Sequence, residues 1–295
     1  MKVSGFTFVR NAINLYYPIV EAITSVLPIC DEFMVAAGDS EDGTTELIRS
    51  IGDPKIKIIE TVWDPVYFVR GAINAQQTNV ALEQCTGDWA FYLQADEVVH
   101  EKYLPRVMEK MTRYLDAPKV EGFLFDYRHF YGDYDHYQIA HNWYPKEIRI
   151  VRNGIEVQSW GSAQSFRRNG KKLKVVHSEA EIYHYGWVRP PKKMTQKQIA
   201  LASLHHDSEW VKKRYPDERR EYNFGRLRTL GRFVGSHPKV MQKRIAEKNW
   251  EISPTKSSQE RQDRLSIRIL SFLENKILRR RLGGYKNYIL IDPPK

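Results

Sequence analysis

The stretch Trp89-Ala90-Phe91-Tyr92-Leu93-Gln94-Ala95-Asp96-Glu97 joins an apolar run to two acidic residues. The apolar run is rich in aromatic residues and too short for a helix, which predicts a buried β-strand. Open α/β sheets bind ligands at the carboxyl ends of their strands, where Asp96 and Glu97 would lie. A carboxylate there can hold a divalent cation that bridges the phosphates of a nucleotide. A simpler interpretation is that Asp96 caps a helix near residues 101–115.

The sequence around this stretch alternates between strand-like and helix-like patterns. Strand and helix follow each other four times with short connections, which favours an α/β fold with a mainly parallel sheet covered by helices. Expected strands cover residues 3–9, 33–37, 55–61, 88–94, 121–131, 146–152 and 181–187, and expected helices cover residues 14–27, a short segment through 51, and 72–83.

Three further motifs accompany the strand-then-acid stretch. The second expected strand runs into Asp39-Ser40-Glu41-Asp42-Gly43-Thr44, residues 70–79 place a Gly and a later Asn on one helix, and Thr86-Gly87-Asp88-Trp89 leads into the fourth strand. In this order, the motifs resemble those of family 2 glycosyltransferases, with Gln94 in place of the first Asp of the family's Asp-x-Asp motif. The resemblance implies a GT-A fold, a Rossmann-like domain that binds nucleotide sugars.

The resemblance also implies a nucleotide site. Phe8 would lie against the base, Asp39 would accept hydrogen bonds from the base edge, as suits the N–H of uracil, and Arg70 would face the diphosphate. Asp39 and Asp42 could equally form a turn, and Asn79 could hydrogen-bond the loop after the second strand. The implied nucleotide-binding residues are Phe8, Arg10, Asn11, Asp39, Asp42, Arg70, Asn79, Gln94 and Ala95.

A divalent cation, Mn²⁺ or Mg²⁺, is the implied cofactor. Asp96 would act in catalysis as a metal ligand, because the metal neutralises charge on the leaving nucleoside diphosphate. His184 stands where GT-A enzymes often have a histidine ligand. Gln94 can coordinate through its carbonyl oxygen but brings no charge, so it implies a weak metal site or a loss of activity. Glu97 is expected to cap the following helix.

Family 2 enzymes invert the anomeric centre, which requires a general base for the acceptor proton. In the family this base is usually an acid on a loop before the histidine, but residues 159–166 contain none. Glu156 is nearest and is our candidate for a catalytic role, with Asp126, Asp133 and Glu147 further away. These residues do not identify the base.

Charge divides the chain near residue 187. Residues 1–186 hold 20 Lys and Arg against 25 Asp and Glu, whereas residues 187–295 hold 26 against 11. The Pro-rich break at Arg189-Pro190-Pro191 predicts a GT-A domain over residues 1–188 and a basic helical extension over residues 189–295. Helices are expected over residues 194–213, 219–231 and 260–282.

The last expected helix has one apolar face and ends in Arg279-Arg280-Arg281. It could lie on an anionic membrane surface where lipid-linked acceptors reside, but packing on the catalytic domain is the interpretation we favour. No nucleic-acid motif is present, so nucleic acid is not an expected partner. The apolar face consists of Leu265, Ile269, Phe272, Leu273 and Ile277.

The remaining composition suggests a cytoplasmic protein, with the basic helix as a candidate contact to the inner face of a membrane. No apolar run approaches the ~20 residues of a membrane span, and the start of the chain lacks the plan of a signal peptide. Cys30 and Cys85 are expected to be reduced core thiols.

The resemblance implies a metal-dependent, inverting glycosyltransferase that moves a sugar from a nucleotide-sugar donor, for which a UDP-sugar is expected, to an acceptor that the sequence does not name. The expected acceptor partner is a glycan or a lipid-linked molecule. The altered Gln94 and the missing base leave open a catalytically silent GT-A protein that binds a nucleotide or glycan or serves as a scaffold. A nucleotidyltransferase would need a Gly-rich phosphate loop after the first strand, and Phe8-Val9-Arg10-Asn11-Ala12 is not one.

Overall fold

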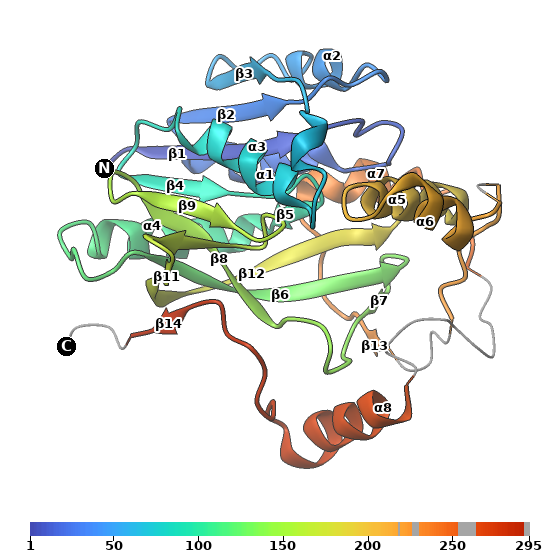
Figure 1. Ribbon diagram of the computed structural model, residues 1–295. Helices are drawn as coiled ribbons and strands as arrows, with labels where there is room; N and C mark the ends of the chain where they lie inside the picture. Colours follow the sequence, from blue (N-terminus) through green and yellow to red (C-terminus); the bar gives the residue numbers. More distant parts are fainter. Residues whose placement is uncertain (218, 226–229, 253–263, 292–295) are drawn as a thin grey trace.

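The computed structural model describes residues 1–217, 219–225, 230–252 and 264–291. A curled sheet of 11 strands runs through the molecule, with helices on both faces (Figure 1), and the remaining three strands form a separate small sheet. The strands are β1 (Val3–Val9), β2 (Glu32–Ala37), β3 (Ile56–Glu60), β4 (Trp89–Tyr92), β5 (Glu97–Val99), β6 (Gly122–Gly132), β7 (His136–Tyr137), β8 (Lys146–Arg152), β9 (Val157–Trp160), β10 (Ser165–Arg168), β11 (Lys171–Lys172), β12 (Lys174–Val188), β13 (Gly231–Arg232) and β14 (Ile289–Leu290).

The helices lie between these strands and after β12. They are α1 (Ile19–Val26), α2 (Thr44–Arg49), α3 (Ala72–Leu82), α4 (Leu104–Arg113), α5 (Pro191–Ser203), α6 (Ser208–Arg214), α7 (Gln242–Ala246) and α8 (Leu265–Phe272). Short 3₁₀ turns cover Leu27–Ile29, Pro65–Tyr67, Glu101–Tyr103 and Lys239–Met241, and a π-helical turn, Leu273–Leu278, continues α8.

Four parallel strands in the order β3-β2-β1-β4 form the part of the sheet that carries the expected site. Successive side chains of a strand point to opposite faces. In β1, Val3 and Val9 therefore pack in the core beneath α1 and α4, whereas Phe6 packs on the other face with Ala81 of α3. The parallel arrangement brings the carboxyl ends of β1 and β4 to the same edge.

The rest of the sheet mixes strand directions. β8 pairs antiparallel with both β4 and β6, and β12 pairs parallel with β6 and antiparallel with β5. The expected short strand over residues 181–187 is the end of the 15-residue β12. In the β12–β5 ladder His184 lies opposite Glu97, which sets this histidine beside the end of the 89–97 stretch.

Two of the helices expected after β12 differ from the structure. One helix was expected over residues 194–213, but the structure has two, α5 and α6. The second begins because Asp207 caps it, accepting a hydrogen bond from the Trp210 backbone N–H at 2.8 Å. The expected helix over residues 219–231 is wrong for its described part, which is irregular and leads into β13. Phe224 is buried there against Tyr131, so the extended chain contributes aromatic packing.

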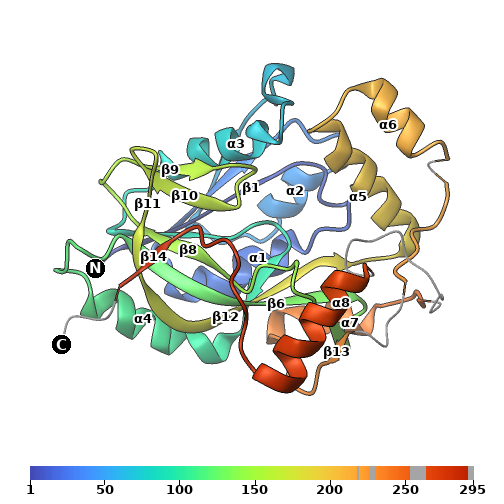
Figure 2. The ribbon, with the colours of Figure 1, turned by 60° about the horizontal axis from the view of Figure 1, so that its bottom comes forward.

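The C-terminal segment returns to the sheet, since β13 pairs with β7 and β14 pairs with β12. Helix α8 stands away from the central strands, whereas β14 runs back alongside them (Figures 1 and 2). Residues 260–263 of the expected last helix lie outside the described residues. The division into residues 1–188 and 189–295 stays a prediction.

Helix α8 is attached through its polar edge. Ser271 Oγ accepts a hydrogen bond from the backbone N–H of His141 at 2.9 Å, and Asn275 Nδ2 donates to the carbonyl of Ile139 at 2.9 Å. The favoured interpretation, in which the apolar face packs on the catalytic domain, is therefore wrong for most of that face. The exposed members are Leu265, Ile269, Phe272 and Ile277.

Cys30 and Cys85 are buried and free, as predicted. Burial raises the pKa of each thiol to about 12, so both are protonated at neutral pH and pack as small apolar side chains. Within the described ranges no helix is both long enough and apolar enough to span a membrane.

Candidate functional site

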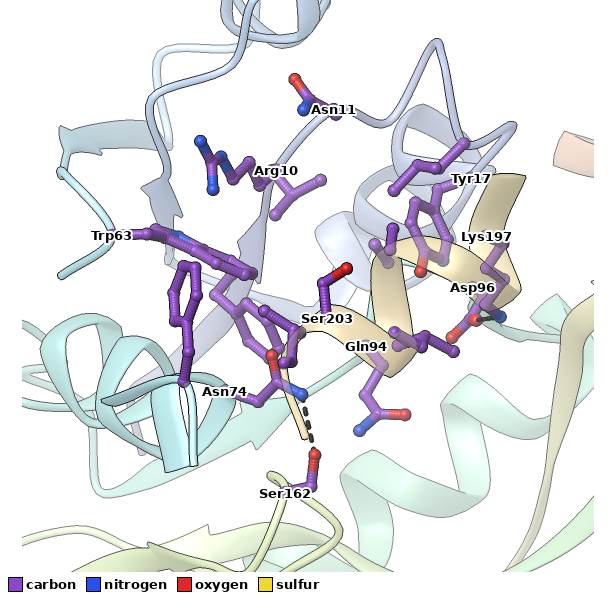
Figure 3. A pocket seen from close by; sticks show the side chains of 18 of the residues that line it. Arg10, Asn11, Tyr17, Trp63, Asn74, Gln94, Asp96, Ser162, Lys197 and Ser203 are labelled. Atoms are coloured by element: carbon purple, nitrogen blue, oxygen red, sulfur yellow. Dashed lines mark hydrogen bonds and ion pairs between the residues drawn. The ribbon is translucent and has the colours of Figure 1, made fainter. Parts of the chain in front are cut away.

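A pocket of about 400 Å³ opens where β1 and β4 end (Figure 3). The residues that follow these two strands form two walls, α5 forms a third, and the loop that contains Trp63 and Phe68 closes one end. The structure thus brings together segments far apart in the sequence. The predicted site residues that line the pocket are Phe8, Arg10, Asn11, Gln94, Ala95, Asp96 and His184.

One end of the pocket has an aromatic wall with a cation beside it. The ring centroids of Phe8 and Trp63 are 6.1 Å apart, and the Arg10 guanidinium lies 5.4 Å from the Trp63 ring. Asp39 supports both, because its carboxylate accepts from Arg10 Nη2 at 3.1 Å and from the Trp63 backbone N–H at 3.2 Å. Gly38 permits this approach, since a Cβ there would lie 2.5 Å from Trp63 Nε1.

Five predicted site residues do not line this pocket: Asp39, which supports its aromatic end from behind, and Asp42, Arg70, Asn79 and Glu156. Asp42 forms the turn before α2, accepting from the Thr44 backbone N–H at 3.1 Å, as the turn interpretation expected. Asn79 Oδ1 accepts from the Ser159 backbone N–H at 2.7 Å, so it ties α3 to β9 and not, as the alternative interpretation expected, to the loop after the second strand. Arg70 is exposed on the loop before α3. Glu156 is exposed beside Asn169, so the structure does not bring this candidate base near Asp96.

Glu97 is not a helix cap. It is fully buried and forms a two-pronged ion pair with Arg149, with Nε–Oε2 and Nη2–Oε1 distances of 2.7 and 2.8 Å. Tyr127 donates to the same carboxylate at 2.7 Å, and the Gln94 backbone N–H donates to it at 3.1 Å. These bonds hold residues 94–97 in shape, and thereby position Asp96 at the pocket.

Asp96 forms the centre of the other end of the pocket. Its Oδ2 accepts a hydrogen bond from Lys197 Nζ at 3.0 Å, and its Oδ1 lies 3.7 Å from His184 Nε2. Burial alone would raise the pKa of Asp96, but Lys197, His184 and Arg189 together hold it well below its usual range. The capping interpretation is wrong, since His100, not Asp96, caps the turn that follows.

His184 is held in one tautomer by a second histidine. His129 Nε2 lies 2.7 Å from the carbonyl of Tyr144, so this nitrogen must carry a proton and donate it. Burial lowers the pKa of His129 to about 3 and that of His184 to about 4, so both rings are neutral at pH 7. His129 Nδ1 then accepts from His184 Nδ1 at 2.9 Å, and the lone pair of His184 Nε2 faces Asp96.

The residues present do not fit a divalent ion at this cluster. It offers one carboxylate, and Oδ2 of that carboxylate is already bonded to Lys197. Buried Lys197 and Arg189 carry two positive charges against the single charge of Asp96, whereas hard divalent ions need oxygen ligands and negative charge. Among the described residues, no group of three or more His, Cys, Asp and Glu could hold a metal ion. A metal at Asp96 and His184 stays a prediction that this charge opposes.

The sequence patterns did not identify several residues that line the pocket. Trp63 could have been found, because it directly follows the third strand, where ligands bind. Ser162 lies in the acid-free segment of residues 159–166, and its Oγ accepts from Asn74 Nδ2 at 2.8 Å. No sequence pattern around Lys197 marks it as a site residue, because it is one of several lysines on α5. Of the described residues that line the pocket, Asp96 is the only acid.

Comparisons with known proteins give a family. Residues 11–169 match the family model described as glycosyl transferase family 2, which is more than half of the chain. No curated protein matched the chain.

Three solved structures illustrate its structural relatives. S. aureus TarS 1–349 in complex with UDP is 16% identical to this chain, with a TM-score of 0.41. The match covers 72% of this chain and 69% of that chain. Glucosyl-3-phosphoglycerate synthase from Mycobacterium tuberculosis with Mn²⁺, UDP and glucosyl-3-phosphoglycerate is 18% identical (TM-score 0.30, 44% of each chain). Mannosyl-3-phosphoglycerate synthase from Rubrobacter xylanophilus is 22% identical (TM-score 0.29, 44% of this chain and 41% of that chain). The chain spans 39% of a longer TarS structure.

Proposed function

The chain belongs to glycosyl transferase family 2, and on that premise we propose that it transfers a sugar from a UDP-sugar to an acceptor hydroxyl. The observation that carries the proposal is one pocket at the strand ends that joins an aromatic wall to a buried charged cluster. A nucleotide sugar has the same division, with a flat base at one end and a diphosphate further along.

The aromatic end would bind the nucleoside. Bases stack well on aromatic rings and on the plane of an Arg guanidinium, which Phe8, Trp63 and Arg10 offer together. Trp63 Nε1 is buried and has no acceptor among the described residues. Arg10 and Trp63 lie on one side of the pocket and Asp96 and Lys197 on the other (Figure 3), which would direct the diphosphate toward the charged cluster.

The transfer would be a single displacement with inversion. The bond from the anomeric carbon to the diphosphate oxygen breaks and its electron pair leaves with UDP, while the acceptor oxygen bonds the carbon and gives its proton to a base. Asp96 is a poor candidate for that base, because its ion pair with Lys197 disfavours protonation. The acceptor would be a glycan or a lipid-linked molecule.

A silent binding protein is the second candidate. It is favoured by the neutral Gln94, whose amide donates to the Ala163 carbonyl at 3.0 Å, and by the lack of a second acid among the described pocket residues. Such a protein would bind the nucleotide without turnover.

A thermal-shift and calorimetric screen tests both. UDP should stabilise the protein more than the diphosphates of guanosine, adenosine and cytidine, and at 100 times its dissociation constant it should add about 2.7 kcal/mol. UDP-sugars should be slowly hydrolysed or transferred. Binding of UDP with no turnover of any UDP-sugar would favour the silent protein, and no stabilisation by any nucleoside diphosphate would contradict both candidates.

A further inference from the structure

The ammonium group of Lys197 is built into the charged end of the pocket. It is held by two acceptors, Asp96 Oδ2 at 3.0 Å and the Gly186 carbonyl at 2.7 Å, and it lies 5.1 Å from the centroid of the Tyr17 ring. An ammonium has three N–H donors, so one is left without a hydrogen-bond acceptor among the described residues. Lys197 also lines the pocket, although its side chain is only 7% exposed.

A second buried cation shares this arrangement. Arg189 Nη2 donates to the same Gly186 carbonyl at 2.9 Å, and its other terminal nitrogen donates to the Leu15 carbonyl. The Arg189 guanidinium lies 4.9 Å from the Tyr17 ring. Both cations are buried and only Asp96 opposes them, so the cluster keeps a net positive charge that no described side chain balances.

Burying unbalanced charge is costly unless a ligand of opposite charge completes the site. A diphosphate would do so, because it brings at least two negative charges and many acceptor oxygens. A divalent cation would do the opposite, since it would add two positive charges beside Lys197 and Arg189.

We propose that the Lys197 ammonium takes the place of the divalent cation: it binds the donor's diphosphate, with Asp96 as the residue that positions it and Arg189 as the supporting charge. This inference rests on the proposed function, because it assumes a nucleoside diphosphate in the pocket. Donor binding is then independent of divalent metal. The dependence on Mn²⁺ or Mg²⁺ that the family resemblance implies is replaced by a charge that the chain itself supplies.

The position of α5 explains how a residue 101 positions after Asp96 reaches it. Pro190 and Pro191 begin the helix immediately after β12, and Pro at the first helical positions is compatible with the missing N–H. The far end of α5 is tied across the pocket, where the Gly71 backbone N–H donates to the Leu204 carbonyl at 3.1 Å. The helix therefore crosses the strand ends, with Lys197 over Asp96.

The test is calorimetry of the full chain with UDP and with uridine, each in EDTA and in Mn²⁺. We expect UDP to bind with the same dissociation constant, within about twofold, in both buffers. UDP that binds only with Mn²⁺, or ten times more tightly with it, would overturn the inference while leaving the proposed function standing. If neither UDP nor uridine binds in either buffer, the proposed function fails and the inference fails with it.

Variants locate the effect. Lys197→Met should weaken UDP binding in EDTA about 10- to 150-fold, the range for a lost charge-assisted hydrogen bond, but should leave uridine binding unchanged. Lys192→Met, an exposed lysine on the same helix, is the matched control and should bind UDP like the parent. Equal UDP affinities for Lys197→Met and the parent would refute the role of Lys197. The comparison of the parent in the two buffers does not depend on how well the variant folds.

Discussion

Gly186 lies against the two side chains expected to bind a cation. A Cβ at this position would be 2.5 Å from His184 Nε2 and 2.7 Å from Asp96 Oδ2, so any larger residue must displace one of them. The Gly186 carbonyl also accepts hydrogen bonds from Lys197 and Arg189. This glycine is thus a residue on which the geometry of the charged cluster depends.

We expect Gly186→Ala to weaken UDP binding and to destabilise the fold by about 1–3 kcal/mol, because an added methyl group overpacks a tight site. Calorimetry with UDP and urea unfolding measure the two effects. Unchanged UDP affinity in the variant would mean that the nucleotide does not reach this end of the pocket.

Asp39 acts at the other end through its two partners. Asp39→Ala should release Arg10 and the Trp63 loop, and weaken both UDP and uridine binding by about 1.5–3 kcal/mol, the range for hydrogen bonds to a charged group. The fold should persist, because the Asp39 side chain is 38% exposed. Glu41→Ala removes the same charge from the same turn and should change neither affinity. Equal losses in both variants would indicate a long-range charge effect in place of positioning by Asp39.

At the scale of elements, the ion pair of Glu97 with Arg149 joins β5 to β8 beneath the pocket. Both side chains are fully buried, and removing one partner leaves the other charge without compensation. The pair therefore stabilises the segment that presents Asp96, although neither residue lines the pocket.

Glu97→Gln should lower the free energy of unfolding by about 3–5 kcal/mol, the range for breaking a buried ion pair. Glu109→Gln breaks an exposed pair with Arg106 and should cost less than about 1 kcal/mol. Urea unfolding compares the two variants. A loss below about 1 kcal/mol for Glu97→Gln would show that the buried pair contributes little.

At the scale of the whole molecule, α8 presents an apolar strip to solvent between basic residues. Its exposed apolar residues include Ile269 and Phe272, and the exposed cations Arg268, Lys276 and Arg280 lie on the same segment. An apolar strip flanked by cations suits an anionic membrane surface. β14 lies beyond this helix and pairs with β12, so removing the whole C-terminal segment would also remove part of the sheet.

We expect the chain to bind vesicles that contain phosphatidylserine at low salt, and Ile269→Ser/Phe272→Ser to lose that binding while UDP affinity is unchanged. Salt should weaken binding, because charges in solvent are screened within ~10 Å at 0.1 M. Vesicle sedimentation measures it, with neutral vesicles as the control. Equal sedimentation of parent and variant would contradict a membrane role for this face.

Local patterns were sufficient for the longer strands and for α3 of the α/β GT-A fold. The strands over residues 3–9 and 146–152 agree with β1 and β8, and α3 is within one residue of its expected end. The family and the fold class predicted from the sequence are confirmed. The reason is physical: side-chain periodicity, turn residues and the apolar run before Asp96 are properties of consecutive residues.

What only the tertiary structure decided is which distant side chains meet. The contacts of Asp96 with Lys197 and of Glu97 with Arg149 join residues 101 and 52 positions apart, and no local pattern signals either one. The exposure of the apolar face of α8 likewise depends on tertiary contacts, because the polar edge of this segment hydrogen-bonds to residues 139–141. The sequence alone determined the strands β1 to β4, β6 and β8 and the acid that follows the fourth strand. Long-range packing placed Lys197 beside Asp96. A buried charge is stable only with a partner, so the two side chains pair.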